Sequence, residues 1–209
     1  MVTTEQEWLK CNDPVQMIDL LEDAYSDRKL RLWGCASLRL VWSMLKEESF
    51  RDSVIFAEDF ADCLASEGEL EKARAEAQWT FEIVESIGLS QAEYDLTLAA
   101  ASITNSSAFQ GARSVAECTE INGKLGSALC RDIFGNPFRP VLLDPRWLSS
   151  TVFNLASTIY DERVWERMPI LGDALMDAGC DSDEIIQHCQ GPGPHVRGCW
   201  VVDLLLGKT

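Results

Sequence analysis

The stretch SDRKLRLWGCASLRLVWSML, residues 26–45, decides the fold class because its apolar residues recur at steps of three and four. The pair Ser26-Asp27 at its start is typical of a helix N-cap, since a short polar side chain accepts hydrogen bonds from the free N–H groups of a first turn. The apolar residues that follow are Leu30, Leu32, Trp33, Leu38, Val41, Trp42 and Leu45. Their spacing predicts an amphipathic helix with a wide buried face.

Similar patterns extend in both directions from this stretch. Asp13-Pro14 predicts a helix start, because proline fits the first turn, and Ser90 with Glu93 has capping-box spacing. Further helices are predicted over residues 49–65, 69–88, 90–103, 112–134, 144–163, 168–178, 182–189 and 195–206. We therefore predict an all-α fold, a compact multi-helix bundle of about nine or ten helices. Stacked helical hairpins are one possible arrangement of them.

Two segments interrupt the helical pattern. The Pro/Gly-rich segment near residues 135–145 cannot continue a helix, because proline lacks an N–H group and restricts the residue before it; within it, residues 141–143 are predicted to be extended. The polar stretch NSSAFQG, residues 105–111, is a candidate linker. It predicts an N-terminal helical region over 1–107 and a C-terminal helical region over 108–209. Whether the two regions pack as a single domain stays open.

The charge balance bears on the class of partner. The chain has 18 basic and 34 acidic residues, a formal net charge of -16, and such a field repels nucleic-acid phosphates and anionic lipids. Neither nucleic acid nor a membrane is therefore expected as a partner. The sequence lacks the apolar run of a membrane span and the pattern of a signal peptide, which predicts a cytoplasmic protein with reduced thiols.

The candidate metal ligands gather near the C-terminus, where both histidines of the chain lie. The set is Cys180, His188, Cys189, His195 and Cys199. If residues 195–206 are helical, His195 and Cys199 lie on one face, and thiolate and imidazole are ligands that zinc prefers. The spacing contains no CxxC pair, so the alternative is ordinary core packing without a cofactor.

The same residue types are those of a Cys-His nucleophile pair, which also needs a thiol of lowered pKa, a base within reach and an oxyanion site. The sequence supplies only the residue types. Phosphate loops, dinucleotide glycine patterns and the HExxH and GxSxG motifs are missing from it. No catalytic residue is assigned, and enzymatic activity stays an open question with a non-catalytic role preferred.

Arginines flank the irregular C-terminal segment. The candidate binding residues are Arg131, Arg139, His195 and Arg197, because the planar guanidinium suits carboxylate or phosphate. Pairing within the chain is the favoured alternative, with Asp132, Asp144, Asp161 and Asp203 as partners. A second basic group consists of Arg28, Lys29, Arg31 and Arg39. It is interpreted as a solvated helix face, with the docking of an acidic partner as the alternative.

Several phrases of the sequence resemble an uncharacterised planctomycete paralogous family. They are EWLKCNDPVQMIDLL at 7–21, the stretch at 26–42, CRDIFGNPFRPVLLDPRWL at 130–148 and GPHVRGCWVVDLLLGK at 193–208. The resemblance implies a bacterial cytoplasmic protein and brings with it no activity, cofactor or catalytic residue. Relatives often carry several cysteines where this chain has only Cys35. By analogy, a large set of paralogues suits recognition modules.

These observations together predict a non-catalytic helical module for protein interaction or regulation, with another protein as its partner. One alternative is a zinc-binding protein or a thiol enzyme that uses the C-terminal Cys/His residues. A further alternative is a structural subunit of a larger assembly.

Overall fold

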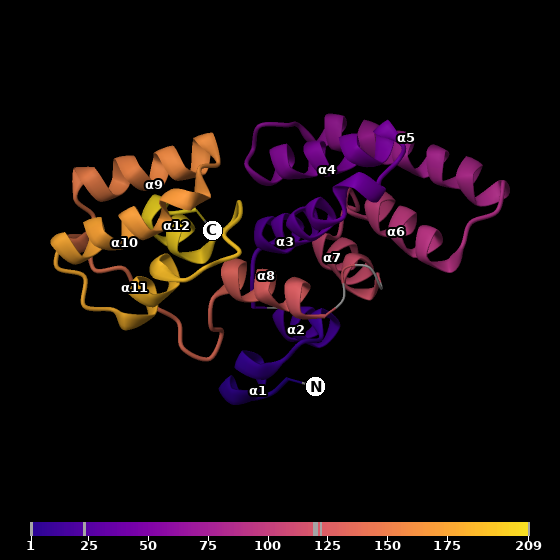
Figure 1. Ribbon diagram of the computed structural model, residues 1–209. Coiled ribbons are helices and arrows are strands. Elements are labelled where there is room, and N and C mark those ends of the chain that lie inside the picture. Colours follow the sequence, from indigo (N-terminus) through magenta and orange to yellow (C-terminus); the bar gives the residue numbers. More distant parts are fainter. Residues whose placement is uncertain (1, 23, 119–120, 122, 209) are drawn as a thin grey trace. The chain divides into compact units, whose positions relative to one another are not determined.

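The computed structural model describes residues 2–22, 24–118, 121 and 123–208, and the predicted all-α fold is confirmed in them (Figure 1). These residues contain twelve α-helices and three short 3₁₀ helices, more than the nine or ten predicted, and no strand. None of the helices in the described ranges has the length and apolar character needed to cross a bilayer. The chain divides into two compact units, residues 1–130 and 131–209, called here the N-terminal and C-terminal units.

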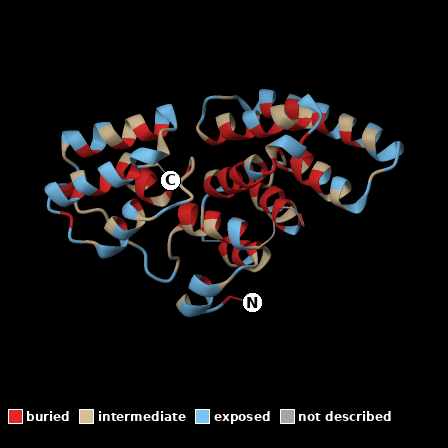
Figure 2. Cartoon of the chain, viewed as in Figure 1, coloured by how far each residue is buried: buried red, intermediate tan, exposed pale blue. Residues whose placement is uncertain are grey.

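The N-terminal unit is built from consecutive helices that pack on their neighbours. The helices are α1 (Glu5–Lys10), α2 (Pro14–Leu21), α3 (Asp27–Leu40), α4 (Glu48–Ala61), α5 (Glu67–Ser86), α6 (Gln91–Ser102) and α7 (Ala108–Glu117), with the 3₁₀ helix η1 (Trp42–Met44). Helix α4 packs on α5, α5 on α6, and α6 on α7, while α3 contacts both α4 and α7. Figure 2 shows α3 buried along most of its length, as the predicted wide apolar face requires.

Local capping signals fix where several of these helices begin. Asp13 accepts hydrogen bonds from the N–H groups of Val15 and Gln16, and Ser26 accepts one from Lys29. Ser90 and Glu93 form the predicted capping box at the start of α6. Helix α1 was not predicted from the sequence, although Thr4 and Glu7 form the same motif there. Capping boxes satisfy N–H groups that a helix start leaves without a partner.

Within the polar stretch 105–111, only residues 105–107 connect α6 to α7, so the boundary predicted after residue 107 falls between two packed helices of the N-terminal unit. Helix α7 already begins at Ala108. A Cβ on Gly111 would lie 2.8 Å from the Ser102 carbonyl oxygen at the end of α6. Glycine at position 111 thus lets α7 approach the end of α6 closely.

The basic group on α3 is neither a solvated face nor a free docking patch. Arg28 pairs with Asp62 over 3.0 Å, and Arg39 pairs with Glu58. Arg31 is buried and donates to the Ile103 carbonyl over 2.8 Å. The sequence interpretation was wrong because acidic and carbonyl acceptors from α4 and the end of α6 meet these cations, an arrangement that no pattern local to α3 encodes.

The C-terminal unit contains the last residues of α8 (Lys124–Phe134), then α9 (Ser150–Glu162), α10 (Met168–Asp177), α11 (Asp183–Gln190) and α12 (Trp200–Leu206). Two 3₁₀ helices, η2 (Pro145–Trp147) and η3 (Trp165–Arg167), lie between them. Helix α9 packs on α10 and α12, and α11 packs on α10 and α12. The shared core includes Val152, Ile159, Leu171, Leu175, Ile185, Cys189, Val201 and Leu205.

Several helix predictions were wrong in their extent. The predicted helix over 26–45 ends at Leu40, and the one over 144–163 begins only at Ser150, after the 3₁₀ helix η2. The predicted helix over 112–134 is two helices, α7 and α8, and its positions 119, 120 and 122 lie outside the described residues. The predicted helix over 195–206 begins only at Trp200, because Gly198 takes a φ of 93° that a right-handed helix excludes. Residues 141–143, which were predicted to be extended, lie in a segment without regular secondary structure.

Candidate metal centre

Four polar side chains from separate segments of the C-terminal unit meet in one place. Asp132 lies in the last turn of α8, His188 in the last turn of α11, and Cys199 at the N-cap of α12. His195 lies in the irregular segment between α11 and α12. One ligand atom from each of these four residues lies within 4.8 Å of the other three. Asp132 and Cys199 are buried, and the two histidine side chains are 17% and 9% exposed.

The Gly191–Pro194 segment directs His195 into this group. Gly193 has a φ of 83°, and a Cβ there would lie 2.9 Å from the His195 backbone nitrogen. Only glycine fits a left-handed position with so close a neighbour. The chain thereby folds back, so that Nε2 of His195 lies 3.4 Å from the Gly191 carbonyl oxygen.

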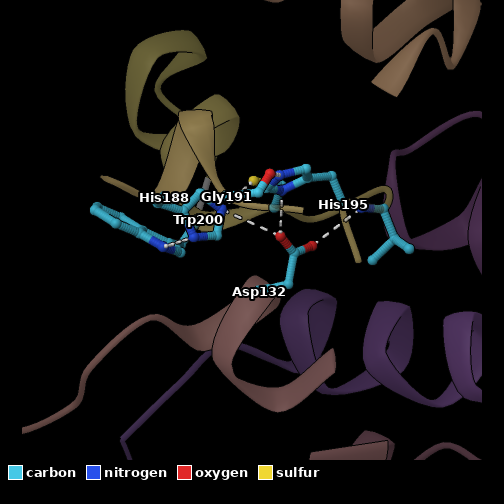
Figure 3. A network of polar contacts seen from close by, with 7 residues as sticks. Asp132, His188, Gly191, His195 and Trp200 are labelled. Atoms are coloured by element: carbon cyan, nitrogen blue, oxygen red, sulfur yellow. Dashed lines mark hydrogen bonds and ion pairs between the residues drawn. The ribbon is translucent and has the colours of Figure 1, made fainter. Parts of the chain in front are cut away.

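The Asp132 carboxylate is the centre of the polar contacts (Figure 3). Its Oδ1 lies 3.1 Å from Nε2 of His188 and 2.9 Å from Nδ1 of His195. Its Oδ2 accepts a hydrogen bond of 3.0 Å from the Val196 backbone N–H. Nε2 of His188 also lies 3.1 Å from Sγ of Cys199. The buried carboxylate therefore has partners for both oxygens, as a buried charge requires.

Burial and these contacts shift the pKa of the Asp132 carboxyl and the pKa of the Cys199 thiol in opposite directions. Burial alone would raise the pKa of Asp132, but hydrogen bonds from His188 and His195 outweigh it and hold that pKa below its ordinary value. Burial, reinforced by the Asp132 charge, raises the pKa of the Cys199 thiol well above its ordinary value, although the N–H groups of Val201 and Val202 act in the opposite direction. The metal-free site therefore pairs a carboxylate with a protonated thiol at neutral pH.

This geometry does not suit a thiol nucleophile. In a Cys-His-Asp triad, the thiol and the carboxylate contact opposite nitrogens of the imidazole, so that one nitrogen takes the proton while the other is held. Here Asp132 and Cys199 both approach Nε2 of His188. Nucleophilic cysteines also have a lowered pKa and some exposure, whereas Cys199 is fully buried with a raised pKa.

Three of the five residues predicted as metal ligands converge, and two do not. His188, His195 and Cys199 belong to the group, while Cys180 and Cys189 lie outside it. Cys189 lies against α10, because a Cβ added to Gly172 would lie 3.0 Å from the Cβ of Cys189. Burial raises the pKa of the Cys189 thiol to about 12. None of the eight cysteines, all in the described part of the chain, forms a disulfide.

Asp132 is the ligand candidate that sequence reasoning missed, because it was assigned as an arginine partner. It pairs instead with His188 and His195. A signal was present: Asp132 follows Leu129 at helical spacing and stands beside Ile133 in a buried stretch. An acidic residue on a buried helix face needs hydrogen-bond partners for its charge, and the two histidines are such partners here.

The four predicted binding residues have different surroundings. Arg139 pairs on the surface with Glu184 over 3.4 Å, and the Arg197 guanidinium lies 5.7 Å from the centre of the Tyr160 ring. Arg131 lies beside Asp132 on α8 and is partly buried. Of the four, only His195 contributes to the group around Asp132.

Comparisons of the chain with protein-family models, with curated proteins and with solved structures found no match. The resemblance to planctomycete proteins stays a prediction.

Proposed function

We propose that the C-terminal unit is a non-catalytic zinc-binding module, with Asp132, His188, His195 and Cys199 as ligands. The observation that carries the proposal is the approach of four suitable ligand atoms to within 4.8 Å of one another. A bound ion would join α8 to α11 and to the start of α12, across segments that are distant in the sequence. Zinc sites of this kind contribute directly to the stability of small units.

The types of ligand favour zinc over other common ions. One thiolate and two imidazoles suit zinc and related transition ions, whereas magnesium and calcium prefer oxygen ligands. Four protein ligands fill a tetrahedral shell and leave no position open for water or substrate. A structural role is therefore favoured over a catalytic one.

The surroundings of His195 also support a metal ion at this place. If Nδ1 of His195 binds the ion, the ring proton is on Nε2, which faces the Gly191 carbonyl oxygen. Metal-bound histidines typically donate their second N–H to such an acceptor, which fixes the ring and its tautomer.

Metal analysis of protein purified without a metal-affinity tag tests the proposal. The protein is loaded with zinc sulfate, dialysed and analysed by mass spectrometry for metal content, and we expect about one zinc per chain. Cobalt substitution should give the absorption of a tetrahedral thiolate complex. The Cys199→Ser variant should lose both signals. The matched control is Cys180→Ser, which removes a buried thiol of the same unit outside the group.

Two results would contradict the zinc proposal. One is wild-type protein that retains no zinc after loading. The other is a Cys199→Ser variant that retains as much zinc as the wild type with an unchanged cobalt spectrum.

We propose a second candidate function, the docking of a partner protein in the cytoplasm. An apolar stripe on α5 and its C-cap residue Ile87 supports it. Trp79, Ile83 and Ile87 follow one another at steps of four and are 66%, 42% and 77% exposed. Glu76 and Glu82 flank the stripe and are exposed. We propose a basic amphipathic helix as the occupant, because its apolar face would cover the stripe and its lysines would meet the glutamates. The net charge of -16 disfavours a second copy of this chain.

Titration with a synthetic amphipathic helix of leucine and lysine tests this second function. We expect binding that weakens as salt is added and that is lost in the Trp79→Ser/Ile83→Ser double variant. The control is Leu142→Ser, which changes an exposed leucine of the C-terminal unit. Equal binding of a leucine/glutamate peptide, or undiminished binding by the double variant, would contradict the proposal.

A further inference from the structure

Trp200 donates a hydrogen bond to His188, one of the proposed zinc ligands. This hydrogen bond is incompatible with zinc binding at His188. The indole Nε1–H of Trp200 donates to Nδ1 of His188 over 3.1 Å, and the two rings meet edge to face at 5.3 Å (Figure 3). An indole nitrogen is only a donor. Nδ1 of His188 therefore presents a lone pair to Trp200 and carries no proton.

This hydrogen bond fixes the tautomer of the His188 ring. A neutral imidazole has one ring proton, so that proton is on Nε2. Both neighbours of Nε2, the Asp132 carboxylate and the Cys199 sulfur, lie at 3.1 Å and can accept it. In the absence of a metal, the His188 ring thus accepts a hydrogen bond at Nδ1 and donates one from Nε2.

Zinc at Nε2 of His188 would reverse this arrangement. The ion takes the Nε2 lone pair, so the ring proton moves to Nδ1, where it would point at the indole N–H. Two donors then face each other. The outer partner of His195 is a carbonyl acceptor, whereas the outer partner of His188 is a donor. The two histidines therefore differ in how readily they accept an ion.

We propose that Trp200 opposes metal binding at His188 by holding its Nε2–H tautomer, so that zinc binds only as the indole leaves Nδ1. This inference rests on the proposed zinc function. It makes the site a reversible one, in which occupancy is coupled to the position of Trp200.

The packing around Trp200 makes this coupling effective. A Cβ on Gly135 would lie 3.2 Å from Cγ of Trp200, so the indole lies directly against the backbone that follows α8. Trp200 is also the first residue of α12. Departure of the indole from His188 therefore changes contacts at Gly135 and at the start of α12. Zinc should accordingly alter the fluorescence of Trp200.

Zinc affinity of the full chain, measured by competition with a chromophoric chelator, tests the inference. We expect the Trp200→Phe variant to bind zinc about ten- to a hundredfold more tightly than the wild type, the range in which outer partners of metal-bound histidines act. The control is Trp165→Phe, which changes a tryptophan that contacts Tyr160 in the same unit and should leave the affinity unchanged. A variant with a damaged fold would bind more weakly, so a gain in affinity cannot arise from loss of structure.

Nitrogen NMR of the metal-free wild type provides a second test that needs neither a variant nor zinc. We expect the His188 signals of a neutral ring with a protonated Nε2 and a bare Nδ1. A protonated Nδ1 overturns this inference alone. If the wild type binds zinc and the Trp200→Phe variant binds it equally or more weakly, this inference alone is overturned. Failure of both proteins to bind zinc overturns the proposed function and this inference with it.

Discussion

Nδ1 of His195 lies 2.9 Å from Oδ1 of Asp132, although the two residues are 63 positions apart in the sequence. Asp132 is 2% exposed and its carboxylate also accepts from His188 and Val196. The pair thus joins the end of α8 to the segment before α12. A buried carboxylate with several charge-assisted partners is a strong constraint on the fold of the C-terminal unit.

Replacement of this carboxylate should destabilise the C-terminal unit even without metal. In the metal-free network, His195, His188 and the Val196 N–H all donate hydrogen bonds to the Asp132 carboxylate. In Asp132→Asn, the side-chain NH₂ group is itself a donor, so it would face at least one of these donors. We expect a loss of about 3 kcal/mol in the free energy of unfolding of this unit. Amide hydrogen exchange in residues 150–206, measured with a chelator present, would report it.

The matched control for Asp132→Asn is Asp173→Asn, which changes an exposed carboxylate on α10. It should alter the stability of the same unit by less than about 0.5 kcal/mol. Equal effects of the two variants would show that the contacts of Asp132 do not contribute.

The Arg39–Glu58 pair should couple more strongly than a surface pair. Arg39 donates from Nη2 to Oε2 of Glu58 over 2.7 Å and from Nε to Oε1, and the Glu58 side chain is 5% exposed. A double-mutant cycle with alanine should give a coupling energy of about 2 kcal/mol, because the contact is bidentate and partly buried. Urea unfolding of the N-terminal unit measures it.

The exposed pair Arg74–Glu71 on α5 serves as the comparison. Its coupling energy should be below about 0.5 kcal/mol, as is usual for surface pairs. A coupling at Arg39–Glu58 no larger than this would contradict the prediction.

Two helical glycines should respond in opposite directions to alanine. A Cβ on Gly111 would lie 2.8 Å from the backbone oxygen of Ser102, whereas a Cβ on Gly68 in α5 meets nothing within 4 Å. Gly111→Ala should destabilise the N-terminal unit by about 1–3 kcal/mol, because a backbone has to move. Gly68→Ala should stabilise it by up to about 1 kcal/mol, since alanine is the better helix former. Thermal unfolding of both variants tests the pair, and the same sign for both would contradict it.

The Lys46–Glu93 ion pair predicts a pH dependence in the N-terminal unit. The hydrogen bond from Lys46, with others from Ser90, lowers the pKa of Glu93 to about 2. Because the folded pKa lies below the ordinary value of 4.5, the contribution of Glu93 to stability is complete above that value. It is lost as pH falls toward 2. In Lys46→Met, the pKa of Glu93 should move back toward 4.5 in an NMR titration.

Glu69 provides the internal control for this titration. It occupies the equivalent capping-box position at α5, and its pKa is lowered by Ser66 without a lysine. Lys46→Met should leave the pKa of Glu69 unchanged. A Glu93 pKa that also stays unchanged would show that the cap, and not Lys46, is responsible.

Local sequence signals predicted most of the helices. Apolar periodicity and the caps at Asp13, Ser26 and Ser90 act over three or four residues, so the structure of each helix start can be inferred from its own segment. The errors arose where the deciding contact was distant. The cations of α3 were misassigned because their partners Asp62, Glu58 and Ile103 lie on other elements.

The candidate site was predicted only in part, and partly for a wrong reason. His195 and Cys199 were expected on one helix face, yet residues 195–199 are not helical. They converge because glycines at 193 and 198 turn the chain back. Cys180 and Cys189 have the right chemistry but lie outside the group, and Asp132 was assigned to arginines. The function predictions, from protein interaction to zinc binding, stay proposals.

By itself, the sequence determined the helical class, several helix starts and the presence of zinc-type ligands near the C-terminus, since these depend on neighbours within one or two turns. Only the tertiary structure decided which ligands meet, that Asp132 lies at their centre, and that Trp200 donates to His188. The reason is physical: the direction of a side chain depends on the helix or turn that carries it, but its partner depends on how distant segments pack.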